Sequence, residues 1–219
     1  MNEDVLVRTD DSTSSYQAAN GRAVSEEASV NPNAPTNIYG EVGLWMAILA
    51  DLTIFAIMFG TVFYYRSFNP ELYATSQAQL NQPIALINTL LLLTSSYFVF
   101  VGVQAARMWR WAAAKRFVGF AILCGLGFVG MKVIEYNQKF SAGITVSTNE
   151  FFMFYFMTTI LHLVHVLTGL AALFLIRAGF PKDGEKAKGR VFALEAGGVF
   201  WHMVDLLWVV LMAVVYLSR

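Results

Sequence analysis

The chain has 219 residues, of which 57% are hydrophobic and only 14% are charged, and its mean hydropathy is +0.53. Soluble domains average about 25% charged residues, so this composition indicates a protein whose solvent is lipid. The 15 basic and 15 acidic residues cancel, which leaves no basic field for nucleic acid, and the single cysteine, Cys124, excludes an internal disulfide and cysteine-based zinc or iron–sulfur sites.

The first 40 residues differ from the rest of the chain. They are rich in Asp, Ser, Asn, Thr and Ala and lack the basic patch and apolar run of a signal peptide. Such a segment cannot bury enough apolar surface to offset the entropy lost on ordering. We therefore expect residues 1–40 to form a disordered tail and residues 41–219 to form the membrane domain.

Crossing the hydrocarbon core of a bilayer requires roughly 20 apolar residues in helical form. Five stretches qualify, the third of them marginally, and four of the five are more than twice as long as a strand of a membrane β-barrel, about 10 residues. The sequence therefore predicts an all-α, polytopic bundle of five transmembrane helices. In chain order the predicted helices cover residues 43–65, 83–106, 117–134, 151–176 and 191–217.

The third stretch is marginal because Lys132 interrupts it. The ammonium group must either extend to the membrane surface or pair with Glu135, which lies one helical turn away.

Basic residues are distributed unevenly between the two sides of the predicted bundle. Of the 15 lysines and arginines, 11 lie on the side of the N-terminal tail and 4 on the other side. The positive-inside rule therefore predicts that the N-terminus lies in the cytoplasm and the C-terminus on the opposite side of the membrane.

Several ionisable residues fall within the predicted spans, where each costs at least about 2.5–3.5 kcal/mol and usually faces a partner. They come from the first, fourth and fifth helices, and four of them, Asp51, His165, His202 and Asp205, lie at similar predicted depths. We expect these three helices to pack their polar stripes together through imidazole–carboxylate hydrogen bonds. The members of this predicted polar network are Asp51, His162, His165, Glu195, His202 and Asp205.

Three interpretations of this network are open. The first is purely structural, the second is proton or lipid-headgroup handling, and the third is ligation of a metal or heme. Three histidines are too few for a catalytic heme–copper centre, but a single b-type heme between His162 or His165 and His202 would make the chain a heme-bearing membrane anchor. We expect no metal site, and Trp201 and Trp208 share another face of the fifth helix, where packing or subunit contact is the simpler explanation.

Sequence patterns in all five helices are similar to one family. The fifth helix contains EAGGVFWHMVDLLWVVLMAVVY (Glu195–Tyr216), which resembles the closing helix of subunit III of cytochrome c and quinol oxidases, with its glutamate followed by WHxVDxxW. The fourth helix contains HLVHVLTG, like the family's HxxHVxxG. Similar patterns in the other helices are GLWMAILADLTIFA (Gly43–Ala56), INTLLLLTSS (Ile87–Ser96) and IEY (Ile134–Tyr136).

Departures from the family pattern point to one branch. Asp51 stands where the family has a glutamate, Leu163 where a glycine is common, and Lys132 where a glutamine is common. Together with FYFMTTILHLVHV, these differences resemble the NorE-type branch associated with nitric oxide reductases.

The resemblance implies a non-catalytic subunit of a respiratory heme–copper enzyme, of the cytochrome c oxidase or nitric oxide reductase type. Such a subunit holds no redox centre, binds phospholipid between its helices, and stabilises a subunit I-type catalytic partner and its proton uptake. Heme and copper or iron are expected in that partner. The resemblance makes Asp51 the residue of greatest interest, and the candidates for lipid or partner contact are Trp201, Trp208, Glu135 and Asn88.

Overall fold

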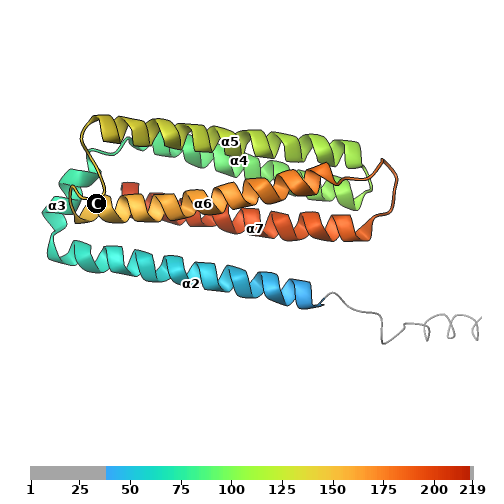
Figure 1. Cartoon of the computed structure of the whole chain (residues 1–219), viewed down its shortest axis with the longest axis horizontal. Helices are drawn as coiled ribbons and strands as arrows, with labels where there is room; N and C mark the ends of the chain where they lie inside the picture. The colour runs from blue at the N-terminus through green and yellow to red at the C-terminus, as the bar shows by residue number, and fades with distance from the viewer. Residues whose placement is uncertain (1–37, 218–219) are drawn as a thin grey trace, which may run out of the picture. The chain divides into compact units, whose positions relative to one another are not determined.

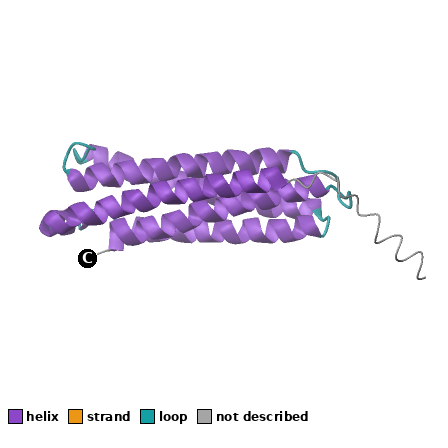
Figure 2. Cartoon of the chain, turned by 90° about the horizontal axis from the view of Figure 1, so that it is seen from below, coloured by secondary structure: helices purple, strands orange, loops and turns teal. Residues whose placement is uncertain are grey.

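The structure, a computed structural model, describes residues 38–217, so the predicted disordered tail of residues 1–40 lies almost wholly outside the described residues. From Glu41 onward the chain forms one compact unit. Within the described residues it consists of helices and short connections (Figures 1 and 2). The helices are α2 (Ile38–Phe68), α3 (Pro70–Gln77), α4 (Gln82–Arg107), α5 (Trp111–Ser141), α6 (Glu150–Ala178), α7 (Lys188–Met212) and the short π-helix η1 (Ala213–Leu217).

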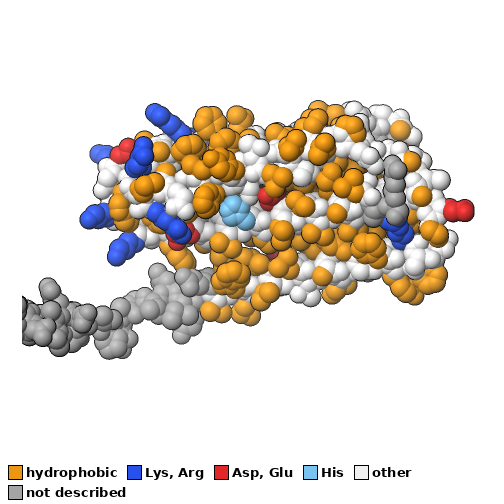
Figure 3. Space-filling view, turned by 180° about the vertical axis from the view of Figure 1, so that it is seen from behind, with side chains coloured by type: hydrophobic (Ala, Val, Ile, Leu, Met, Phe, Trp, Pro, Cys, Tyr) orange, Lys and Arg blue, Asp and Glu red, His pale blue; other side chains and the backbone are white. Residues whose placement is uncertain are grey.

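The five predicted spans are confirmed. Helices α2, α4, α5 and α6, and α7 together with η1, are each long and apolar enough to cross a membrane. Apolar side chains cover the middle of the molecule, and Lys and Arg side chains gather at one end (Figure 3). Helix α5 continues to Ser141 instead of ending at residue 134, because the charged residues of its second half, Lys132, Glu135 and Lys139, face the protein interior. The sequence did not predict α3, which is only 8 residues long and too polar to resemble a span.

Helices α4 to α7 pack closely in a four-helix bundle, and α2 runs beside them with a sparser set of contacts (Figure 1). In the most apolar part of α2, 17% of the residues are buried, compared with 50% in the span formed by α7 and η1. Isoleucine and aromatic side chains supply most of the buried face of α2, and they include Ile48, Phe55 and Phe59. This difference makes α2 the least enclosed of the spans.

Close approach of the bundle helices depends on two glycines beside Trp201. A Cβ atom added at Gly125 would lie 3.0 Å from the Trp201 ring, and one added at Gly169 would lie 2.8 Å from it. Small residues at these positions let α5 and α6 close on the indole of α7, which is the usual way that helices approach one another in lipid.

Hydrogen bonds join the connections at each end of the bundle. At the end that carries the α4–α5 and α6–α7 connections, the Trp111 indole donates to the Glu185 carbonyl at 2.8 Å, and the Gly184 amide donates to the Trp109 carbonyl at 3.0 Å. At the opposite end, Lys139 donates to the Gln79 carbonyl at 2.5 Å. These bonds hold the helix ends in register.

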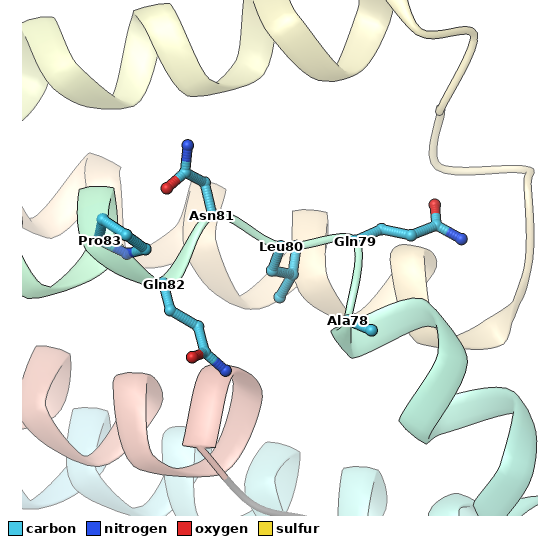
Figure 4. Close-up of a pocket in the computed structure, with 6 residues that line it drawn as sticks. All are labelled: Ala78, Gln79, Leu80, Asn81, Gln82 and Pro83. Carbon is cyan, nitrogen blue, oxygen red and sulfur yellow. The ribbon is translucent and has the colours of Figure 1, made fainter.

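The α3–α4 linker borders an open hollow of about 510 Å³, lined by residues 78–83. Figure 4 shows that Gln79, Asn81 and Gln82 leave the linker in different directions. Asn81 caps α4 by accepting the Ile84 amide at 3.3 Å, and Gln82 donates to the Tyr216 carbonyl at 3.2 Å. Because these polar groups do not converge and two of them serve the fold, the hollow is not a candidate ligand site.

Candidate functional site: polar groups within the spans

Asp51 and His165 form a pair between α2 and α6. The His165 Nε2 atom lies 3.4 Å from Asp51 Oδ2, and the Nδ1 atom lies 2.8 Å from the Leu161 carbonyl oxygen. The Phe55 ring meets the imidazole edge-on, with centroids 5.5 Å apart. The two ring nitrogens therefore lie near an oxygen atom each, one on α2 and one on α6 itself.

His162 lies deep in the bundle, apart from Asp51. The side chain is fully buried and its ring packs between Phe128 and Trp208, with centroid distances of 5.8 and 5.3 Å. Neither ring nitrogen has a hydrogen-bond partner among the described residues. The imidazole acts here as an aromatic packing group.

Glu195 and Arg107 form an ion pair at one end of the α4–α7 seam. The Arg107 Nε donates to Glu195 Oε1 at 2.7 Å, and both side chains are partly exposed. The glutamate therefore joins α7 to α4, whereas the sequence predicted that it would face the first and fourth helices.

His202 and Asp205 also lie at the α4–α7 seam. The Ser96 hydroxyl hydrogen-bonds to His202 Nδ1, and Ser96 is also close enough to the Asp205 carboxyl to hydrogen-bond to it. Asp205 is buried, but His202 is exposed on the outer surface. The predicted meeting of three polar stripes is thus wrong for α7.

The physical reason is the packing of Gly198 on the same stripe of α7. A Cβ atom there would lie 3.3 Å from Val99 and 3.6 Å from Val103, so this stripe is pressed against α4. Of the predicted network, only Asp51 and His165 join two of the expected helices.

A second polar cluster, which we call the interior cluster, consists of Lys132, Glu135, Tyr155 and Tyr216. Lys132 donates to Glu135 at 2.9 Å and to the Tyr216 hydroxyl at 3.0 Å. Glu135 also accepts the hydroxyls of Tyr155 at 2.8 Å and Tyr216 at 2.6 Å. The ammonium lies 4.8 Å from the centroid of the Trp208 ring. All four residues of the cluster are almost completely inaccessible, so each charge has several partners inside the bundle.

Sequence reasoning found only part of the interior cluster. Of the two alternatives for Lys132, pairing with Glu135 is confirmed and extension to the membrane surface is wrong. The i, i+3 spacing was the available signal. Tyr216 gave no such signal, because its position depends on the π-helical turn η1 at the end of α7.

The four candidates for lipid or partner contact are interior in the structure. Trp208, Glu135 and Asn88 are fully buried, and Trp201 is 1% exposed. The Trp208 indole donates to the Thr89 hydroxyl at 3.1 Å, which accounts for its N–H group. The Asn88 amide and the Trp201 indole N–H have no hydrogen-bond partner among the described residues. In the structure these four side chains lie inside the bundle, and lipid or partner contact at them stays a prediction.

Comparison with known proteins decides the family. The profile of the family "Cytochrome c oxidase subunit III" matches residues 15–218. The chain belongs to this family. Similar proteins include a cytochrome c oxidase subunit 3 of Synechocystis sp., which is 27% identical over 80% of this chain and 74% of that protein. The cytochrome bo(3) ubiquinol oxidase subunits 3 of Pseudomonas aeruginosa and Buchnera aphidicola are 26% and 29% identical, over 80% of this chain and 83% and 85% of their own lengths.

Membership of the subunit III family agrees with the resemblance in all five helices. The relatives named above are oxidase subunits, and assignment to the NorE-type branch stays a prediction.

The geometry does not support the alternative of a heme anchor. A bis-histidine heme would require His202 to face His162 or His165 across a shared space. Instead His162 packs on Trp208 inside the bundle, His165 pairs with Asp51, and His202 bonds to Ser96 on the outer surface. Across residues 38–217, no three or more His, Cys, Asp or Glu side chains are grouped to hold a metal ion.

Proposed function

We propose that the chain is the non-catalytic, subunit III-like component of a respiratory heme–copper enzyme. The family match over residues 15–218 and the names of the similar proteins support this role. In this proposal the chain holds no redox centre, and a subunit I-type partner carries heme with copper or iron. The chain stabilises that partner and its proton uptake.

The observation that carries the proposal is the Asp51–His165 pair. In the family resemblance Asp51 matches the intramembrane acid of this helix, and its carboxyl lies 3.4 Å from the His165 imidazole of α6. Because backbone contacts between α2 and the bundle are sparse, this pair helps to set where α2 lies along α6. A correctly placed α2 would preserve the conformation of the surface by which this chain contacts the catalytic subunit during turnover.

We further propose a bacterial cytoplasmic membrane location, with the N-terminus in the cytoplasm. The α4–α5 and α6–α7 connections, together with the helix ends that adjoin them, carry most of the basic residues in residues 38–217, and they lie at the same end of the molecule (Figures 1 and 3). The positive-inside rule assigns that end to the cytoplasm.

Phospholipid is the second proposed partner. A pocket of about 240 Å³ lies between the first part of α2 and the first part of α7. Apolar side chains line most of it, and Glu195 brings the partly exposed ion pair with Arg107 to its edge. Acyl chains in the pocket and a headgroup beside the ion pair fit this combination. The lining residues are Leu44, Trp45, Phe192, Glu195, Ala196 and Val199.

Replacement of Asp51 tests the role of α2. Asp51→Ala leaves His165 without its acidic partner, so we expect less catalytic subunit to co-purify with the tagged chain, or faster loss of activity during turnover. Thr53→Ala is the matched control, because the Thr53 hydroxyl on the same helix bonds only to the Leu49 carbonyl of α2. Unchanged co-purification and unchanged activity decay in Asp51→Ala would refute the proposed role.

Purification from native membranes identifies the complex. The tagged chain, isolated in mild detergent, is expected to bring a heme-containing subunit with it, and subunit identification then distinguishes an oxidase from a nitric oxide reductase. Recovery of the chain without any heme protein would contradict the proposal. A heme spectrum from the isolated chain alone would revive the heme-anchor alternative.

A further inference from the structure

Ser96, His202 and Asp205 form a polar cluster at the α4–α7 seam, which we call the seam cluster. The Ser96 hydroxyl engages His202 Nδ1, which fixes the ring and leaves Nε2 without a hydrogen bond to any described residue. One turn further along α7, the Asp205 carboxyl is 6% exposed and its Oδ1 has no partner. Of these two unpaired atoms, Asp205 Oδ1 is buried, so the imidazole of the exposed His202 is the group that a neighbouring molecule can reach.

The contacts along the seam place this cluster within the span. At one end of the seam, Arg107 pairs with Glu195, and at the other, Gln82 bonds to the Tyr216 carbonyl. His202 follows Glu195 by two helical turns, so it lies about 10 Å further into the span at a rise of 1.5 Å per residue. Its surroundings on the outer surface are apolar, with Phe100 and Leu206 both more than half exposed.

Such a position is costly in lipid. An ionisable side chain in the hydrocarbon region costs about 2.5–3.5 kcal/mol on insertion scales and normally faces a protein partner. Exposed charged residues elsewhere, such as Arg107 and Lys115, lie near helix ends, where they reach the membrane surface. His202 is too far from the ends of α7 and too short to do so.

Resting on the function proposed above, we propose that the seam cluster is the docking site for a transmembrane helix of the catalytic subunit. That helix supplies a hydrogen-bonding side chain, such as Ser, Thr, Asn or Tyr, to the exposed His202 Nε2. The apolar surface around the cluster packs against the rest of the helix. Acyl chains could cover the apolar surface, but they have no donor or acceptor for the imidazole nitrogen.

A shallow pocket beside the cluster has room for the side chain of the docked helix. It has a volume of about 140 Å³ and opens at the outer surface, with His202 at one edge and the Arg107–Glu195 pair at the other. Its wall is otherwise mainly apolar. A volume of this size fits one side chain of a neighbouring helix rather than a cofactor, since cofactor sites occupy about 300–1,000 Å³.

Site-specific photocrosslinking in native membranes tests this proposal. A photoreactive amino acid at Leu206, which is 58% exposed on α7, should crosslink to the heme-containing subunit. The matched control is Leu126 on α5, which is 54% exposed, and its crosslinks to that subunit should be absent or weak. Full-length chain with wild-type residues elsewhere is used, so the result does not depend on a destabilised variant.

The outcomes separate this inference from the function it rests on. Crosslinks from Leu126 without crosslinks from Leu206, or lipid adducts alone from Leu206 while heme protein still co-purifies, overturn the docking site and leave the proposed function standing. Absence of any heme protein in the preparation overturns both.

A second measurement uses His202→Leu. This substitution removes the hydrogen-bonding imidazole and puts an apolar side chain of similar size in its place. We expect the ratio of co-purified heme to tagged chain to fall about three- to tenfold, the range for one intramembrane hydrogen-bonding group. Thr94→Ala serves as the control, because Thr94 is exposed on α4 and bonds to the Leu90 carbonyl of its own helix. An unchanged ratio in His202→Leu would count against the docking site.

Discussion

Inside the α4–α7 bundle, Glu135 accepts hydrogen bonds from a lysine and two tyrosines, whereas Asp51 at the seam between α2 and α6 meets one imidazole at 3.4 Å. The first carboxylate is inaccessible, and the second keeps 26% of its side-chain surface exposed. Burial of a charge is tolerated only where its partners are numerous and well placed. The interior cluster therefore belongs to a part of the molecule with one stable arrangement.

The α2 seam has a different character. The backbone of α2 comes close to the bundle helices at only a few points, and only a small part of the apolar surface of α2 is buried. One partly exposed imidazole–carboxyl pair can open at a modest cost, since such pairs contribute about 0–1 kcal/mol. The interior cluster therefore stabilises the fold, whereas α2 can shift against α6 at a lower cost. Asp51, the acid that matters most in the proposed function, lies at this α2 seam.

Removal of Glu135 should have the largest effect on stability. Glu135→Leu leaves the Lys132 ammonium buried without its anion and removes the acceptor of two tyrosine hydroxyls, so we expect a loss of about 3–5 kcal/mol. The midpoint of thermal denaturation of the purified protein in detergent measures it.

The matched variant for this prediction combines Glu135→Leu with Lys132→Met. An apolar pair of similar volume no longer buries a charge, so most of the lost stability should return. If the double variant is as unstable as Glu135→Leu alone, the cost arises from packing and not from the unpaired charge.

A glycine of the bundle should give the next largest effect. Gly169→Ala brings a Cβ atom to within 2.8 Å of the Trp201 ring, which must move, and we expect a loss of about 1–3 kcal/mol. Gly130→Ala on α5 is the control, since nothing lies within 4 Å of its added Cβ and the helix gains up to about 1 kcal/mol from the better helix former. Equal denaturation midpoints for the two variants would show that the bundle is less tightly closed than the contacts indicate.

The sequence predicts the spans well because lipid imposes one strong rule, that about 20 apolar residues must follow one another. The same rule misplaces the end of α5. The predicted helix ends where the apolar run ends, but in the structure Lys132, Glu135 and Lys139 face inward and bond to Tyr216, Tyr155 and the α3–α4 linker. A charge in a hydropathy pattern carries no information on which direction it faces.

The sequence also does not determine how a helix is rotated about its own axis. The pattern placed Glu195, His202 and Asp205 on one stripe, but it could not decide whether that stripe faces α2 and α6 or α4. The contacts of Gly198 with Val99 and Val103 decide it, and they depend on the shapes of both helices. Of the predicted network, the Asp51–His165 pair could be anticipated from similar depth alone.

Tyr73 in α3, on the same side of the molecule as the α2 seam, should give the smallest effect. The side chain is 2% exposed, its ring packs edge-on against Phe151, and its hydroxyl has no hydrogen-bond partner among the described residues. Tyr73→Phe removes only the unsatisfied hydroxyl, so stability should be unchanged or rise by up to about 1 kcal/mol.

Burial, with smaller contributions from Glu150 and Tyr65, raises the Tyr73 pKa from 10.0 to about 12. The folded state therefore favours the neutral phenol, and this contribution to stability is fully present below pH 10 and is lost as the pH rises towards 12. Tyrosinate absorbance of the wild type minus that of Tyr73→Phe should show one ionisation near pH 12. An ionisation near pH 10 would mean that α3 leaves Tyr73 in water, and that the looser packing of the α2 side extends to the short helix that joins it to the bundle.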